Sequence, residues 1–143
     1  MKVIKASTPG ELQNIFALRY RVLRAPWNQP YETSYDSLEN SSVNLYINDD
    51  NGGIVACGRL QENENKVGQI RYMAVDESIR GAGYGKILLQ ALEKEAADLG
   101  LRKIELQARE NAVRFYERNG YLIKEKTFLL FGAIQHYLME KAM

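Results

Sequence analysis

The sequence has little of what secreted, zinc-binding and membrane-spanning proteins need. Its single cysteine, Cys57, excludes an intrachain disulfide and any zinc site built from several cysteines, and its mid-strand position predicts a buried, inert thiol. No apolar run approaches the length of a membrane-spanning helix, and residues 1–10 lack the apolar core of a signal peptide. We therefore expect a cytoplasmic protein with no metal and no membrane partner.

The sequence also has no excess of either charge. Lysine and arginine together number 19 and aspartate and glutamate 18, so the net charge of +1 gives no general attraction to nucleic acid. Apolar residues make up 45% and charged residues 26%, which is ordinary for a globular protein. With 143 residues and no repeats or low-complexity segments, the chain is expected to form one domain with its own core.

One stretch, residues 69–100, combines a strand, a glycine-rich turn and a long amphipathic helix. Residues 70–75 are almost uninterruptedly apolar or aromatic, which is typical of a strand covered on both faces. Farther along, four apolar residues recur at helical spacing: Leu88, Leu92, Ala96 and Leu99. The helix is expected from Tyr84 to Leu99, with Gly100 as its C-cap.

Three glycines, Gly81, Gly83 and Gly85, lie at the start of this helix. Glycine costs backbone entropy and adds no packing, so such a cluster favours a loop that a ligand approaches closely. The helix N-terminus has unpaired N–H groups and the positive end of the helix dipole, and Arg80 and Lys86 add positive charge there. The loop therefore predicts a site for phosphate or pyrophosphate.

The spacing of this loop excludes two common phosphate-binding motifs. A Walker A loop needs Ser or Thr after its Gly-Lys pair, but Ile87 stands there. A dinucleotide fingerprint that begins at the first glycine needs another glycine where Lys86 stands. The pattern that fits is R-x-x-G-x-G, formed by Arg80, Gly83 and Gly85.

Together with residues 73–76 (Met-Ala-Val-Asp), this loop resembles the acetyl-coenzyme A loop of the GCN5-related N-acetyltransferase (GNAT) family. A second block, residues 111–121 (NAVRFYERNGY), is similar to a later segment of that family, in which Asn opens a short helix and Tyr precedes a Gly-aromatic pair. The two motifs stand in the family's order and are more specific together than either is alone. The resemblance covers residues 43–143 well and the earlier residues loosely.

This resemblance implies an α/β protein with a single N-acetyltransferase domain over residues 1–143. Its fold would be the acyl-CoA N-acyltransferase (GNAT) fold, a mixed and mostly antiparallel sheet flanked by helices. A capping box at residues 8–11 predicts the start of the first helix, and Asn111 is expected to cap a short one. Hydrophobic patterns and turn signals predict strands at residues 3–6, 43–48, 54–61, 67–75, 102–107, 121–128 and 134–141.

The resemblance also implies an enzyme that moves an acetyl group from acetyl-CoA, its co-substrate, to a primary amine by direct attack on the thioester. In the family, the strand before the loop bulges away from its neighbour, and its free edge pairs with the coenzyme's pantetheine arm. The N–H of Val75 would polarise the thioester carbonyl. The residues carried over as coenzyme contacts are Met73, Ala74, Val75, Arg80, Gly81, Ala82, Gly83, Tyr84, Gly85, Lys86, Asn111 and Tyr116.

Tyr116 and His136 are the candidate catalytic residues. Tyr116 would protonate the departing thiolate, because a phenol with a pKa of about 10 is protonated at neutral pH. No carboxylate stands where the family often has one on the central strands, and no motif anchors Glu62 or Glu105 as a base. His136 lies in a segment that resembles the ElaA branch of the family, so it is either a base or substrate contact in the site, or a structural residue.

The first forty residues offer candidates for the acceptor side. Arg19 falls on the apolar stripe of the first helix, where it either packs its stem with its guanidinium in water or contacts a substrate or a carboxylate at the edge of a site. Trp27, Tyr31 and Tyr35 lie in a loop without periodicity, where they either contact the acceptor or pack against the sheet.

Two other functions stay open from the sequence. A coenzyme A-binding domain without catalysis would act as a sensor or interaction module, which the missing carboxylate favours. A nucleotide-binding module of another class would bind ATP or NAD. The acceptor would be a small-molecule or peptide amine, and an exposed last strand would offer an edge for a homodimer.

Overall fold

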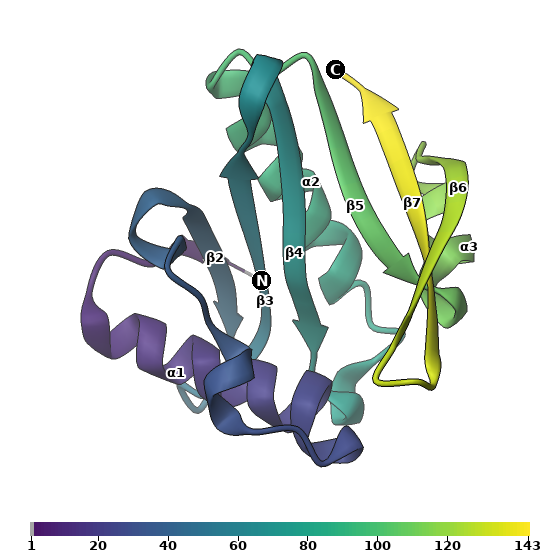
Figure 1. Ribbon diagram of the computed structural model, residues 1–143. Helices are drawn as coiled ribbons and strands as arrows, with labels where there is room; N and C mark the ends of the chain where they lie inside the picture. The colour runs from purple at the N-terminus through teal and green to yellow at the C-terminus, as the bar shows by residue number, and fades with distance from the viewer. Residues whose placement is uncertain (1) are drawn as a thin grey trace.

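One seven-stranded mixed sheet carries helices on both faces (Figure 1). The computed structural model describes residues 2–143. The strands are β1 (Val3–Lys5), β2 (Val43–Asn48), β3 (Ile54–Glu62), β4 (Val67–Val75), β5 (Lys103–Arg109), β6 (Leu122–Leu130) and β7 (Ile134–Ala142). The helices are α1 (Pro9–Arg19), α2 (Tyr84–Asp98) and α3 (Val113–Arg118), and a π-helical turn, η1 (Tyr20–Arg24), follows α1.

The strand order across the sheet is β1-β2-β3-β4-β5-β7-β6. Among these strands only β4 and β5 pair in parallel, because the crossover helix α2 connects them. This confirms the predicted fold class, a mixed and mostly antiparallel sheet flanked by helices. The observed strand ends lie within about two residues of the predicted ones.

Helix α1 begins as predicted. The Thr8 hydroxyl accepts a hydrogen bond from the N–H of Glu11 at 3.2 Å, and the Glu11 carboxylate accepts one from the N–H of Thr8 at 3.1 Å, a complete capping box. After Arg19 the helix widens into η1, which packs against β4. Single π-helical turns of this kind are frequent at functional sites.

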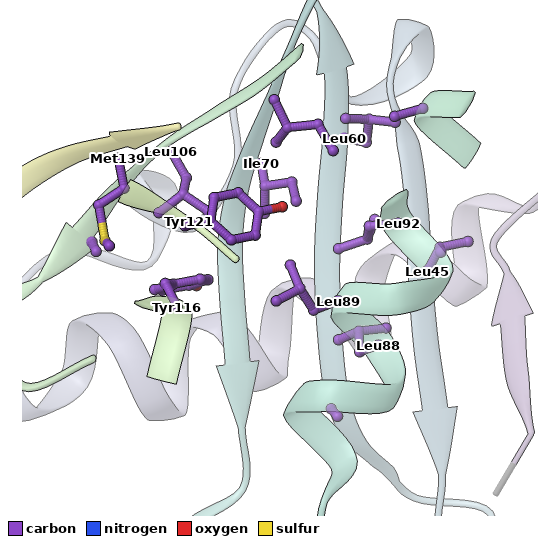
Figure 2. Packing of buried hydrophobic residues seen from close by; sticks show 14 of the residues in the cluster. Leu45, Leu60, Ile70, Leu88, Leu89, Leu92, Leu106, Tyr116, Tyr121 and Met139 are labelled. Carbon is purple, nitrogen blue, oxygen red and sulfur yellow. The ribbon is translucent and has the colours of Figure 1, made fainter. Parts of the chain in front are cut away.

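Two hydrophobic clusters, one on each face of the sheet, hold the layers together. Strand β2 contributes to both because its side chains alternate: Ile47 joins the cluster under α2, whereas Tyr46 joins the cluster under α1. Figure 2 shows the cluster under α2, to which that helix contributes Leu88, Leu89 and Leu92, all fully buried. Cys57 lies in the α1 cluster at 0% exposure, and burial raises the pKa of its thiol to about 11, as expected of an inert cysteine.

A bulge interrupts β4, because Tyr72 and Met73 both lie opposite Gly58 of β3. Tyr72 has a φ of +56°, in the left-handed region that side chains disfavour. Strand β4 pairs with β5 only from Val67 to Ile70, and beyond this stretch the two strands diverge (Figure 1). The centre of the sheet is therefore open over half its length, as the family resemblance implied.

Arg19 is completely buried, so the expected water-exposed guanidinium is wrong. Its guanidinium donates to the carboxylate of Glu39 at 2.9 and 3.2 Å, to the carbonyl of Ser34 at 3.0 Å and to Oδ1 of Asn44 at 2.7 Å. Of the alternative, the carboxylate contact is present, but its carboxylate is that of Glu39 inside the fold and the guanidinium does not line the cleft. Arg19 instead ties the loop after α1 to the sheet.

Arg59 of β3 completes this internal ionic network. It is 0% exposed and donates to Glu39 at 2.8 Å and to Asp36 at 2.7 and 2.9 Å. The guanidinium carbon of Arg59 lies 5.0 Å from the centroid of the Tyr72 ring, and the guanidinium carbon of Arg19 lies 4.2 Å from the same centroid. Both fully buried arginines are thus paired with carboxylates and pack on the bulge residue.

Two predictions about the C-terminal half are wrong. Asn111 does not cap the short helix, because a 3₁₀ turn (Glu110–Ala112) precedes α3 and moves the N-cap to Ala112, which makes no side-chain capping bond. The last strand is not an edge, because β7 inserts between β5 and β6. A homodimer through a sheet edge stays a prediction, and within the described sheet the edge on this side is β6.

We predict that Gly58→Ala destabilises the fold, because an added Cβ would lie 2.6 Å from Sδ of Met73 and 2.8 Å from Cδ1 of Leu92. Overpacking of this kind costs about 1–3 kcal/mol, which urea denaturation would measure. Gly10→Ala is the matched control, because its Cβ would meet only Oγ1 of Thr8, at 4.0 Å, and alanine favours the helix. An unchanged midpoint for Gly58→Ala would contradict the tight packing described for the bulge.

Candidate active site

A cleft of about 920 Å³ opens where β4 and β5 diverge. The glycine loop and α3 line it on the face of the sheet that α2 covers, and η1 lines it on the face that α1 covers. The cleft therefore runs through the sheet from one face to the other. A ligand bound in it can present one end on the α2 face and react on the α1 face.

The glycine loop leaves open space beside its backbone. Gly81 and Gly83 have φ values of +86° and +89°, and a Cβ built on either would meet no protein atom within 4 Å. Gly83 is the N-cap of α2 and forms no side-chain capping bond, and the helix's first backbone bond runs from the N–H of Ile87 to Gly83. The N–H groups of residues 84–86 therefore have no partner within residues 2–143, which suits an anion such as a pyrophosphate.

All the predicted coenzyme contacts except Ala82 line this one cleft. They come from three separate segments: the β4 edge at residues 73–75, the loop at residues 80–86, and Asn111 with Tyr116 beside α3. Ala82 takes part in the turn itself, donating its N–H to the carbonyl of Ile79 at 3.3 Å. That these residues contact a coenzyme stays a prediction.

The N–H of Val75 points into the gap between the strands. Asp76 donates its own N–H to the carbonyl of Val55 on β3 at 2.8 Å. Backbone N–H groups alternate sides along a strand, so the preceding N–H, that of Val75, faces away from β3. Because β5 is not paired with this part of β4, the donor is available to a ligand in the cleft.

Tyr116 places its ring in the core and its hydroxyl at the cleft. The ring packs edge-to-face on Phe115 and Tyr121, with centroids 5.0 and 5.7 Å away. The hydroxyl has no hydrogen-bond partner within the described residues. The oxygen is not fully buried, and because Tyr116 lines the cleft, the hydroxyl opens into it. Burial raises the pKa of Tyr116 above its ordinary value of 10.0, so the phenol is protonated at neutral pH.

His136 lines the cleft on the α1 face. It is in register with Arg109 of β5, and directly paired residues share a face of the sheet. Its Nδ1 lies 2.9 Å from the carbonyl of Ile134, and because a carbonyl only accepts, Nδ1 carries the proton. In the neutral ring Nε2 therefore holds the lone pair, and it has no partner within residues 2–143. Phe128 stacks on the ring at 4.6 Å and fixes its plane.

The surroundings of His136 favour its neutral form. Burial lowers its pKa below the ordinary value of 6.5, and the positive charges of Arg109 and Arg24 lower it further, against the opposing effect of the hydrogen bond to Ile134. The imidazole is therefore unprotonated at neutral pH, with a free lone pair on Nε2. This is the form that can accept a proton.

Several residues suggested by the sequence lie outside the cleft. Glu62 and Glu105 each pair with a nearby lysine and do not line it, so neither is placed as a base. Trp27, Tyr31 and Tyr35 are each more than a third exposed and do not line it either. Tyr35 stacks on Phe16 of α1 and Tyr31 packs against Tyr35, so these two rings pack on the first helix and not on the sheet. A contact of these aromatics with the acceptor stays a prediction.

The cleft is also lined by residues that no sequence motif indicated, among them Arg24, Arg109 and Phe128. Each belongs to a different element, and only the sheet register and the π-helical turn bring them together. The one available signal was that Arg109 lies between the strand predicted at residues 102–107 and the second motif at residues 111–121, so its side chain had to lie near that motif.

The family model for the acetyltransferase (GNAT) family matches residues 11–121. The chain belongs to this family. An uncharacterized N-acetyltransferase of Bacillus subtilis, YjcF, is 37% identical over 142 residues, which is 99% of each chain. Family and relative together identify this GNAT protein as an acetyl-CoA-dependent N-acetyltransferase.

Solved structures show the same fold across this GNAT chain. Escherichia coli ElaA superposes with a TM-score of 0.85 at 18% identity and covers 98% of both chains. An aminoglycoside 6'-N-acetyltransferase complexed with coenzyme A gives 0.82 at 18% identity, over 99% of this chain and 97% of that one. In residues 2–143, no helix has the length and hydrophobicity to cross a membrane, and no three metal-ligating side chains cluster.

We predict that His136 titrates below pH 6.5 and that Arg109→Gln moves its pKa upward, because the substitution removes a nearby positive charge. NMR titration of the imidazole resonances measures both values, and the nitrogen shifts report the Nδ1–H tautomer. Lys94→Gln is the control, because Lys94 is exposed on α2 and does not contribute to the shift. A pKa of 6.5 or above in the unsubstituted protein would contradict the placement of His136.

Proposed function

We propose that the protein acetylates a primary amine of a small-molecule or peptide acceptor by direct transfer from acetyl-CoA, with Tyr116 as general acid and His136 as general base. The observation that carries the proposal is the single through-going cleft. Within it lie an open glycine loop, an unpaired strand edge, a protonated phenol and a neutral imidazole. Bound acetyl-CoA would supply the acetyl group as an activated thioester.

The glycine loop and the β4 edge would hold the coenzyme. The free N–H groups of residues 84–86 and the side chains of Arg80 and Lys86 would bind its pyrophosphate on the α2 face. Residues 73–75 would pair with the pantetheine arm as an added strand does, in the place that β5 leaves open. Asn111, exposed and lining the same cleft, would add a polar contact.

Three groups of this chain would act on the reacting atoms. The N–H of Val75 would donate to the thioester oxygen, where negative charge develops. Nε2 of His136 would take a proton from the attacking nitrogen as the C–N bond forms. The Tyr116 hydroxyl would donate its proton to sulfur as the C–S bond breaks, and solvent returns that proton afterwards.

We predict that Gly83→Val abolishes coenzyme binding, because its side chain would occupy the open space beside the loop backbone. Calorimetry and acetyl-CoA-induced thermal shift should show at least a tenfold loss of affinity. Gly52→Val is a matched control. Gly52 also has a positive φ, of +83°, a Cβ built on it would meet no atom within 4 Å, and it lies in a turn outside the cleft. Both variants carry the same backbone strain of about 1–2 kcal/mol, so only the first should lose binding. Normal binding by Gly83→Val would rule the loop out as the phosphate site.

We predict that Tyr116→Phe slows the chemical step and spares coenzyme binding, because it deletes only the proton donor. The loss, on the order of tenfold to a few hundredfold, should appear in kcat and kcat/KM together, since the proton is donated only in the transition state. Tyr121→Phe is the control. It deletes a hydroxyl that donates to the Glu93 carboxylate at 2.9 Å, and Tyr121 does not line the cleft. Full activity in Tyr116→Phe would rule out Tyr116 as the general acid. If the unsubstituted protein binds acetyl-CoA but releases no thiol with any amine, the alternative of a non-catalytic coenzyme A-binding sensor would be favoured.

A further inference from the structure

The cleft is lined by charge of one sign. No aspartate or glutamate of residues 2–143 lines it, whereas six cationic side chains do: Arg24, Arg71, Arg80, Lys86, Arg109 and Arg118. The chain as a whole has a net charge of only +1, so its composition does not explain this excess. Arg80 and Lys86 belong to the loop proposed for the coenzyme's phosphates. The cations on the α1 face require a different explanation.

Arg24 and Arg109 meet on the α1 face without a carboxylate partner. Arg109, at the end of β5, donates to the carbonyl of Leu23 at 3.3 Å. Arg24, at the end of η1, donates to the same carbonyl and to that of Thr33, both at 3.2 Å. Within residues 2–143 these bonds go only to backbone carbonyls, and neither guanidinium forms an ion pair. Both side chains are half-buried and line the cleft.

The rest of the molecule neutralises its sequestered arginines. Arg19 and Arg59 are fully buried, and each is paired with a carboxylate at 2.9 Å or less. Arg71, the third cation near the α1 face, is paired with Asp36 at 3.2 Å. Among the arginines packed on the α1 face within residues 2–143, Arg24 and Arg109 are therefore the ones without a carboxylate partner.

Leaving these two guanidinium groups unpaired is unfavourable. Burial lowers the pKa of each, and the positive charge of Arg24 lowers the pKa of Arg109 further. Aromatic rings add to the enclosure, because the Arg24 guanidinium carbon lies 5.6 Å from the centroid of Phe131 and 5.7 Å from that of Tyr72. A bound anion would offset both the repulsion and the lost hydration.

We propose, on the basis of the transferase function above, that the acceptor is an anionic amine: a small molecule with a carboxylate close to its primary amine, as in an amino acid. Arg24 and Arg109 would bind the carboxylate, because a guanidinium presents paired donors that match its two oxygens.

The register of the sheet places the proposed anion site beside the proposed base. Arg109 and His136 are direct neighbours on β5 and β7, a pairing that places Cβ atoms about 5 Å apart. The positive charges of Arg109 and Arg24 both act on the His136 imidazole, so the two guanidinium groups lie near the proposed base. A carboxylate bound by them would bring an amine on the adjacent carbon close to that base. The same charges disfavour polyamines and other polycations, whose extra ammonium groups would face Arg24 and Arg109 without a carboxylate to neutralise them.

The test compares matched acceptors. A panel of free amino acids, their carboxamides, the corresponding decarboxylated amines, and spermidine as a polycation would be assayed by thiol release from acetyl-CoA. We expect the best carboxylate acceptor to exceed its carboxamide at least tenfold in kcat/KM. Arg24→Gln and Arg109→Gln should each raise KM for that acceptor at least tenfold, while the dissociation constant of coenzyme A changes less than twofold. Arg114→Gln is the matched control, because Arg114 is exposed on α3 and outside the cleft.

Each result decides between the two proposals. Preference for neutral amines or spermidine would overturn the anionic acceptor and leave the transferase function standing. A comparable loss of coenzyme A affinity in the arginine variants would assign these residues to the coenzyme and overturn the proposal. If no amine in the panel is acetylated, calorimetry with the same amino acids and coenzyme A-loaded protein decides. Amino-acid binding that the two arginine variants weaken would support the carboxylate site without the transfer. If no amino acid binds, the anionic acceptor is overturned, while the transferase function is judged separately by thiol release with peptide amines.

Discussion

The bulge at Tyr72 is the constraint on which the other features depend. Two residues of β4 face a single residue of β3, so the strand bends and can no longer follow β5. That bend leaves a backbone edge without a partner in the interior of a sheet, which proteins ordinarily avoid. The left-handed backbone at Tyr72 is unfavourable by itself, and the guanidinium groups packed against its ring hold it in place. The opening is thus a property of the packed fold.

Four arginines on the α1 face fall into two groups that differ in how their charge is compensated. Arg19 and Arg59 share Glu39, fix the loop after α1 and support the bulge from one face. Removing one partner from such a buried pair typically costs about 3–5 kcal/mol, because the remaining charge is left without compensation. Arg24 and Arg109 lie beside this network, and their guanidinium groups pair with no carboxylate among residues 2–143. The same residue type therefore stabilises the scaffold in one place and, in the other, keeps donors that we propose bind the acceptor.

Much of the architecture could be predicted from the sequence, because short-range signals determine it: the capping box at Thr8, the glycine loop, the alternation along β2 and the helical crossover to β5. Predictions failed where side chains far apart in sequence decide the outcome. The fate of Arg19 depends on a glutamate in a loop without periodicity, and the edge of the sheet depends on the insertion of β7. Arg24 and Arg109 carried no local pattern, so their convergence with His136 became visible only in three dimensions.

The depth of Cys57 has a consequence for the order of events in catalysis. It is the only cysteine of the chain, it lies in the α1 cluster without exposure, and its thiol does not ionise near neutral pH. An acetyl group therefore has no protein thiolate on which to be stored between two half-reactions. This favours a sequential mechanism, in which donor and acceptor occupy the cleft together in a ternary complex. A cleft that spans the sheet suits that requirement, because it admits one substrate from each face.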